Sequence, residues 1–128
     1  MDEPNAASVA LIDGDKVLVI QRAFAPFAGL WTLPGGRREP GETIANTAAR
    51  EVREELGLGV ADLRAVRAMR LGGGFLLQVF ATTTFAGEIV ASPEVAGLRW
   101  IDPDELASLP TTPELDVVVA EAFALFRG

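Results

Sequence analysis

The chain contains no cysteine, no histidine and no tyrosine among its 128 residues. These absences exclude disulfide bonds, thiolate nucleophiles, Ser-His-Asp triads, and zinc or haem sites built on Cys or His. Catalysis must therefore rely on carboxylates, amides, hydroxyls, arginines and the single lysine, Lys16. Because oxygen donors without nitrogen or sulfur suit hard cations, a metal site in this chain is predicted to take Mg²⁺ or Mn²⁺.

Basic residues are scarce, with 11 Lys and Arg against 18 Asp and Glu, which gives a formal net charge of −7. Proteins that bind long nucleic acids rely on clustered basic side chains, so no such partner is expected. No apolar run approaches the roughly 20 residues needed to cross a bilayer. The acidic start at residues 1–4 also lacks the basic region of a secretory signal. We expect a cytoplasmic protein with no membrane partner.

The length and composition predict one folded domain over residues 1–128. Hydrophobic residues make up 49% of the chain and charged residues 23%, which is ordinary for a protein with a buried core. Short runs rich in β-branched residues, bounded by turn signals, predict strands at 7–12, 16–21, 30–33, 63–69, 75–85 and 98–101. The first two are predicted to form a hairpin through Asp13-Gly14-Asp15.

Helical patterns lie in the middle of the chain and at its C-terminal end. Between Thr43 and Leu56 apolar residues recur every four positions, with Thr43 as the expected N-cap and Gly57 as the expected C′ residue. A short helix is predicted after Asp102, and the start signal Thr112-Pro113-Glu114 precedes a longer, apolar-rich helix through about Phe126. Strands, a helix, more strands and further helices in this order predict an α+β fold, an α/β/α sandwich.

Three glutamates on the central helix form a candidate site. At about 100° per residue, Glu51 and Glu55 lie within roughly 40° of each other, with Glu54 on one flank. One such pair, about 6 Å apart at an effective dielectric near 20, costs on the order of 2 to 3 kcal/mol. Either Arg50 and Arg53 or a bound divalent ion must offset this repulsion. The alternative is a solvated helix face with ordinary salt bridges.

The segment from Gly36 to Leu58 resembles the Nudix box, G-x5-E-x7-R-E-U-x-E-E-x-G-U, where U is apolar. The matching residues are Gly36, Glu42, Arg50, Glu51, Val52, Glu54, Glu55, Gly57 and Leu58. Residues 17–36, with their Trp-x-x-Pro-Gly-Gly ending, and residues 98–106 are similar to the flanks of the box in that family. The resemblance therefore extends over most of the chain.

The resemblance implies a Nudix-type α/β/α sandwich with a mixed β-sheet, a catalytic helix at about 43–56 and a C-terminal helix. It also implies hydrolysis of a nucleoside diphosphate linked to another group X, with Mg²⁺ or Mn²⁺ as cofactor. The substrate would be a nucleoside triphosphate or an ADP-ribose-like nucleotide sugar. A non-catalytic nucleotide-binding regulator on the same fold is the alternative. Homodimers are common in the family, but the sequence leaves the oligomeric state open.

Site roles follow from the resemblance position by position. Glu51 and Glu55 look like direct metal ligands, Glu54 a third or water-mediated ligand, and the Gly36 carbonyl a further one. Arg50 and Glu42 are expected to hold the catalytic carboxylates in place. The general base is either Glu51 or Glu94, which lies six residues before Trp100 as in MutT-like members.

Residues outside the box are assigned to the substrate. Arg22 matches a family arginine that contacts substrate phosphate, although it could also be a solubilising residue on an edge strand. Phe75 is a candidate for stacking on the base, as are three other phenylalanines, with core packing as the alternative for all four. The other three are Phe24, Phe27 and Phe80. Trp31 and Trp100 are expected in the core.

Overall fold

The computed structural model describes residues 3–127. Its strands are β1 (Ala6–Asp13), β2 (Lys16–Arg22), β3 (Trp31–Thr32), β4 (Gly35–Arg37), β5 (Gly59–Ala61), β6 (Arg64–Leu71), β7 (Phe75–Thr82), β8 (Thr84–Ala86) and β9 (Val95–Ile101). Its helices are α1 (Ile44–Leu56) and α2 (Leu115–Ala124), and two 3-10 segments are η1 (Gly72–Gly74) and η2 (Pro103–Ser108).

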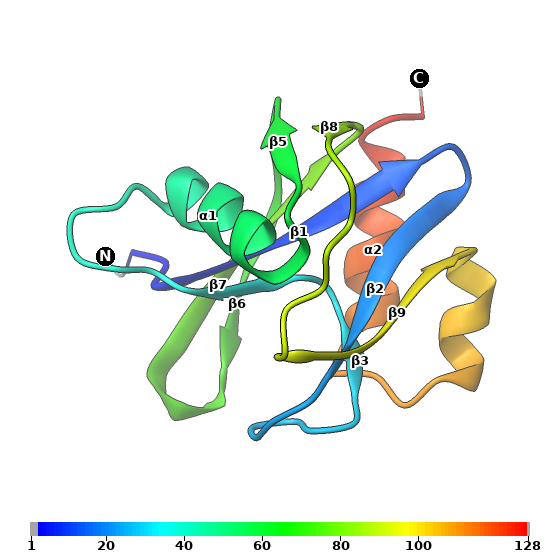
Figure 1. Cartoon of the computed structure of the whole chain (residues 1–128), viewed down its shortest axis with the longest axis horizontal. Helices are drawn as coiled ribbons and strands as arrows, with labels where there is room; N and C mark the ends of the chain where they lie inside the picture. The colour runs from blue at the N-terminus through cyan, green and yellow to red at the C-terminus, as the bar shows by residue number, and fades with distance from the viewer. Residues whose placement is uncertain (1–2, 128) are drawn as a thin grey trace.

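A mixed sheet of seven strands forms the centre of the molecule (Figure 1). β1 runs parallel to β7 and antiparallel to both β4 and β2. Its first residues, Ala6–Ser8, pair with β4, while its last two pair with β2 across the predicted hairpin turn. β2 continues the sheet through β9, and β5 and β8 form a separate two-stranded ribbon.

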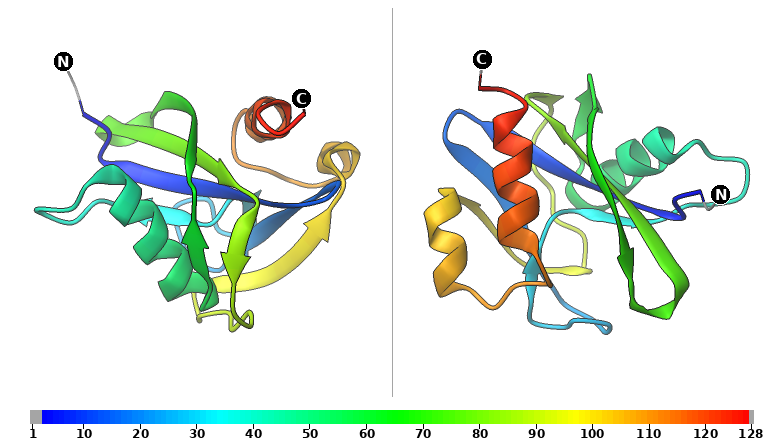
Figure 2. Two further views of the ribbon diagram at one scale, coloured as in Figure 1. Left: turned by 90° about the horizontal axis from the view of Figure 1, so that it is seen from above. Right: turned by 180° about the vertical axis from the view of Figure 1, so that it is seen from behind.

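The two α-helices cover opposite faces of this sheet, as Figure 2 shows from above. Alternate residues of β1 point to opposite faces, so Val9 and Leu11 pack on the α1 side while Ala10 and Ile12 pack on the α2 side. Fully buried aliphatic side chains fill the space between the sheet and each of the two helices. This arrangement confirms the predicted α+β sandwich.

Helix α1 begins and ends where the sequence predicts. The Thr43 hydroxyl accepts a hydrogen bond from the Asn46 backbone N–H at 3.1 Å, and Gly57 takes the left-handed conformation at φ 73°. Ala48, Val52 and Leu56 are fully buried, and burying a Val or Leu side chain is worth about 1.5 to 3 kcal/mol. This apolar stripe fixes the rotation of the helix and so the direction of the neighbouring glutamates.

Several predicted boundaries were wrong. The strand predicted at 75–85 is divided, because the Thr82 hydroxyl donates to the Ala61 carbonyl at 2.6 Å and accepts from the Thr84 N–H at 3.0 Å. Helix α2 begins at Leu115, directly after the predicted start signal and with Glu114 in the left-handed conformation, but it ends at Ala124 rather than near Phe126. The short helix after Asp102 is present as η2, with a capping box between Asp102 and Glu105.

Two strands were not predicted, β4 and β5, and both begin with glycine. Glycine has a low strand propensity, so local sequence does not indicate these elements. In β4 a glycine is required at position 35, because a Cβ there would overlap the Ala7 carbonyl. Across residues 3–127 no helix combines the length and apolar character needed to span a membrane.

Candidate active site

The segment from β4 into α1 brings the backbone of Gly36 against the side chain of Glu51. A Cβ at Gly36 would overlap the Glu51 carboxyl group, so only glycine allows this close approach. The structure thus brings together two residues to which the family resemblance assigns metal-binding roles.

Arg50 joins four groups of the site with one guanidinium. Its Nε and Nη2 donate to the two carboxylate oxygens of Glu42 at 2.6 and 3.0 Å, which is a bidentate pair. Its Nη1 donates to Glu51 Oε1 at 2.9 Å and to Glu54 Oε2 at 3.2 Å, and Nη2 also donates to the Arg37 carbonyl at 2.8 Å. Arg50 therefore ties the loop before α1 to two glutamates of the helix.

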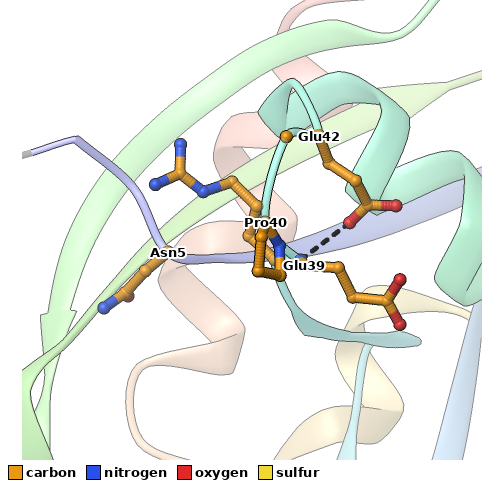
Figure 3. A pocket seen from close by; sticks show the side chains of 6 residues that line it. Asn5, Glu39, Pro40 and Glu42 are labelled. Carbon is orange, nitrogen blue, oxygen red and sulfur yellow. Dashed lines mark hydrogen bonds between the residues drawn. The ribbon is translucent and has the colours of Figure 1, made fainter.

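Glu42 is held as an anion by this network. The Arg50 guanidinium, helped by the Glu39 N–H at 2.9 Å and the Thr47 hydroxyl at 3.0 Å, lowers the pKa of Glu42 to about 2. Figure 3 shows the Glu39 N–H directed at the Glu42 carboxylate. A carboxylate with three donors is a structural anchor rather than an acid or base near neutral pH.

Glu55 lies deepest in the site, with only 4% of the residue exposed. Its Oε1 accepts the Gly35 N–H at 2.7 Å. Burial nevertheless raises the pKa of Glu55 to about 8, and the charges of Glu51 and Glu94 add to that effect. Burial also raises the pKa of Glu51, against the opposing influence of Arg50. A cation near these carboxylates would favour their charged forms.

Glu94 reaches the site on the loop between β8 and β9, which descends past the end of α1 (Figure 1). The loop is fixed to the helix because Val90 N–H donates to the Leu56 carbonyl and Ser92 N–H to the Glu55 carbonyl, each at 2.8 Å. Glu94 lines a pocket of about 170 Å³ together with Glu55 and Arg22. Three predicted residues that are far apart in sequence are thus brought together.

Arg22 ends β2 at the edge of this pocket, and its Nε donates to the Pro26 carbonyl at 2.7 Å. Its positive charge lowers the pKa of Glu55, although by less than burial raises it. The structure therefore places a guanidinium in the same pocket as the buried carboxyl group of Glu55.

Of the predicted site residues, Arg22, Glu55 and Glu94 line this pocket, whereas Gly36, Arg50, Glu51, Glu54 and Phe75 do not. Glu54 has 57% of its side chain exposed and is directed to Arg50 on the outer flank of α1. Phe75 lies under the Arg37 guanidinium, whose Cζ is 4.7 Å from the ring centroid. A larger, open hollow of about 410 Å³ lies on the loop before α1, beside Asn5 and Glu39 (Figure 3). Neither Glu55 nor Glu94 lines this hollow, whereas both line the smaller pocket.

The other aromatic residues divide between core and surface. Trp31 and Phe80 are buried, as expected for packing residues. Trp100 is partly buried and stacks on Phe85 with ring centroids 5.7 Å apart. Phe24 is 60% exposed and also lines the Arg22 pocket.

Sequence reasoning missed two contributors to the site. Gly35 supplies an N–H to Glu55, and its place in the Pro-Gly-Gly segment beside the box was the available signal. Ser92 fixes the Glu94 loop through its backbone N–H, for which no local signal exists.

The donor set fits a hard divalent cation, since it consists of carboxylates and the backbone carbonyl at Gly36. Within residues 3–127, however, no three acidic side chains form a ready-made ligand cluster. Arg50 holds Glu51 and Glu54, while the Gly35 N–H holds Glu55.

Comparison with known proteins agrees with this geometry. The family model described as the NUDIX domain matches residues 2–122. The chain belongs to the Nudix hydrolase family. Nudix hydrolases generally use divalent metal ions, which agrees with the oxygen donors of the site.

Named relatives of this Nudix hydrolase act on nucleotides. It is 35% identical over 124 residues to the CTP pyrophosphohydrolase of Escherichia coli, covering 93% of this chain and 90% of that protein. It is 39% identical over 109 residues to a Mycobacterium tuberculosis protein named as a candidate 8-oxo-dGTP diphosphatase, covering 81% and 77%. The MutT Nudix hydrolase of Burkholderia pseudomallei has a similar structure, with a TM-score of 0.82, 26% identity, and 94% and 98% of the two chains covered.

Proposed function

We propose that residues 1–128 act as one catalytic domain that hydrolyses the diphosphate linkage of a nucleoside triphosphate, with Mg²⁺ or Mn²⁺. The observation that carries the proposal is the meeting of Glu55, Glu94 and Arg22 at one pocket. Glu51 lies against Gly36 and is near enough to Glu55 to influence its pKa. The relatives named for CTP and 8-oxo-dGTP support a triphosphate over an ADP-ribose-like substrate.

In this proposal Glu51, Glu55 and the Gly36 carbonyl hold the metal, and Glu54 joins them directly or through water. The bound ion would offset the charge of the phosphates and lower the pKa of an attacking water. Arg50 keeps Glu51 in position through its 2.9 Å hydrogen bond and is itself fixed by Glu42. Arg22 binds a phosphate oxygen at the mouth of the pocket.

We assign the general base to Glu94 rather than Glu51. Glu51 already accepts a hydrogen bond from Arg50, and a carboxylate engaged by a guanidinium is a weaker proton acceptor. Glu94 lines the pocket on a loop anchored to α1. It would take the proton of the attacking water as the new oxygen–phosphorus bond forms and the bridging oxygen leaves with its phosphate.

The test is a hydrolysis screen with the purified chain and Mg²⁺ over CTP, dGTP, 8-oxo-dGTP, ATP and ADP-ribose, scored by phosphate and pyrophosphate release. We expect release of pyrophosphate from at least one triphosphate, with a lower rate on ADP-ribose. Tight nucleotide binding without turnover of any of them would contradict the proposal and favour a non-catalytic regulator.

A further inference from the structure

Phe24 is an exposed aromatic side chain at the rim of the pocket that holds Arg22, Glu55 and Glu94. A single exposed apolar residue is common on protein surfaces, so exposure alone indicates nothing. Its position is informative because Phe27, in the same loop, is also exposed and does not line the pocket. The loop therefore carries two exposed phenyl rings, of which Phe24 lines the pocket and Phe27 does not.

The loop that carries Phe24 is held at both ends. Arg22 N–H donates to the Leu30 carbonyl at 3.0 Å, and Gly29 N–H donates back to the Arg22 carbonyl at 2.8 Å. Ala23 N–H donates to the Glu94 carbonyl at 3.0 Å, so the residue before Phe24 is tied to the loop of the proposed base. A ring on a fixed loop loses little conformational entropy when a ligand packs on it.

The pocket is too small to enclose a whole nucleotide. Its volume of about 170 Å³ lies below the roughly 300 to 1,000 Å³ of pockets that surround drug-sized ligands. It can take the phosphate end beside Arg22, which leaves the rest of the ligand to lie across the rim. The apolar surface offered at that rim by Phe24 suits a flat aromatic group.

We propose that Phe24 is the stacking platform for the nucleobase of the substrate, and that the base is bound by its face rather than by its edge. Among the residues that line the pocket, which are Ile20, Arg22, Phe24, Ala25, Glu55 and Glu94, Phe24 alone is aromatic. Stacking is tolerant of base identity because every base has a π-face. The identity of the ligand as a nucleotide rests on the proposed function.

Recognition of this kind limits selectivity. Apolar contacts discriminate by about 10- to 200-fold, whereas sites that hydrogen-bond a defining group reject analogues by about 10⁴- to 10⁵-fold. We therefore expect the affinities for purine and pyrimidine nucleotides to differ by less than about 100-fold.

The test uses AMP and CMP with Mg²⁺, because neither contains a diphosphate linkage and binding can be measured without turnover. In isothermal titration calorimetry, Phe24→Ala should weaken binding of both nucleotides by roughly 5- to 100-fold. Phe27→Ala, the matched control, should change it by less than twofold. Phe24→Trp should restore affinity, with quenching of its fluorescence on stacking. Ribose 5-phosphate, which lacks a base, should bind both alanine variants equally.

Unchanged AMP and CMP binding in Phe24→Ala, or an equal loss in both alanine variants, would overturn the proposal. A preference above 100-fold between AMP and CMP would overturn recognition by the face of the base. A change in sedimentation of Phe24→Ala with no change in nucleotide affinity would make the ring a contact between copies of the chain instead. If AMP binding depends on Phe24 but no nucleotide is hydrolysed, the proposed function fails while this inference stands.

Discussion

The carboxyl group of Glu51 lies directly over the backbone of Gly36, in the space that a side chain at position 36 would fill. This contact joins β4 to the middle of α1, between two residues of the proposed metal site. Adding a single methyl group at position 36 should therefore disturb the site.

We expect Gly36→Ala to lower kcat by at least 100-fold, since the added Cβ must displace the Glu51 carboxylate. Gly72→Ala is the matched control, because a Cβ at Gly72 meets no atom within 4 Å and its backbone needs no positive φ. Steady-state kinetics and thermal melts of both variants provide the measurement. Full activity in Gly36→Ala would show that the close approach has no catalytic role.

The Arg50–Glu42 pair predicts a dependence of stability on acid. Because the pKa of Glu42 is lowered to about 2 in the folded protein, the pair stabilises the fold above the ordinary pKa of 4.5. This contribution is lost as the pH falls from 4.5 through 2. In urea titrations across that range, Glu42→Gln should lose less stability than the parent protein. Parallel curves for the two proteins would argue against the pair.

Arg50→Lys tests whether the several hydrogen bonds of the Arg50 guanidinium matter in addition to its positive charge. Lysine keeps the charge but cannot donate to both oxygens of Glu42 while also reaching Glu51 and Glu54. We expect kcat to fall by about 10- to 100-fold with a smaller change in KM, since positioning of catalytic carboxylates is lost. Arg53→Lys, on the same helix, serves as control, and an equal loss there would refute a specific role for Arg50.

Glu55 predicts the opposite pH trend in the metal-free protein. Its pKa is raised to about 8 in the fold, so the folded protein holds a proton that the unfolded chain releases above about 4.5. Stability is therefore full at low pH and is lost as the pH rises through 8, by at most about 5 kcal/mol at roughly 1.4 kcal/mol per pKa unit. In chelator-treated samples, Glu55→Gln should flatten the dependence of the unfolding free energy on pH. An unchanged slope would contradict the raised pKa of Glu55.

Glu94→Gln should lower kcat by about 10²- to 10⁴-fold, the usual contribution of a general base. Glu88→Gln, in the same loop but outside the pocket, is the matched control and should keep near-parent rates. A pH–rate profile that loses its acidic limb in Glu94→Gln would mark the residue as the proton acceptor. Loss of activity in Glu51→Gln with none in Glu94→Gln would reassign the base.

The sequence predicted the parts of the site that depend on local signals. Helix α1 was predicted because Thr43 and Gly57 cap it and its apolar residues repeat every four positions. β4 was missed because Gly35 and Gly36 form a strand only through pairing with β1, which no local pattern reports. The approach of Glu94 to Glu55 was indicated by family resemblance alone, since it depends on backbone hydrogen bonds between distant segments.

The central claim is that Glu51, Glu55, Glu94 and Arg22 form one metal-dependent hydrolytic site. The most direct measurement is a ³¹P NMR time course of CTP with the purified chain, run with Mg²⁺, with EDTA, and with the Glu55→Gln variant. We predict conversion to CMP and pyrophosphate with Mg²⁺, and none with EDTA or with the variant. Turnover that persists in EDTA, or in Glu55→Gln at the parent rate, would contradict the account.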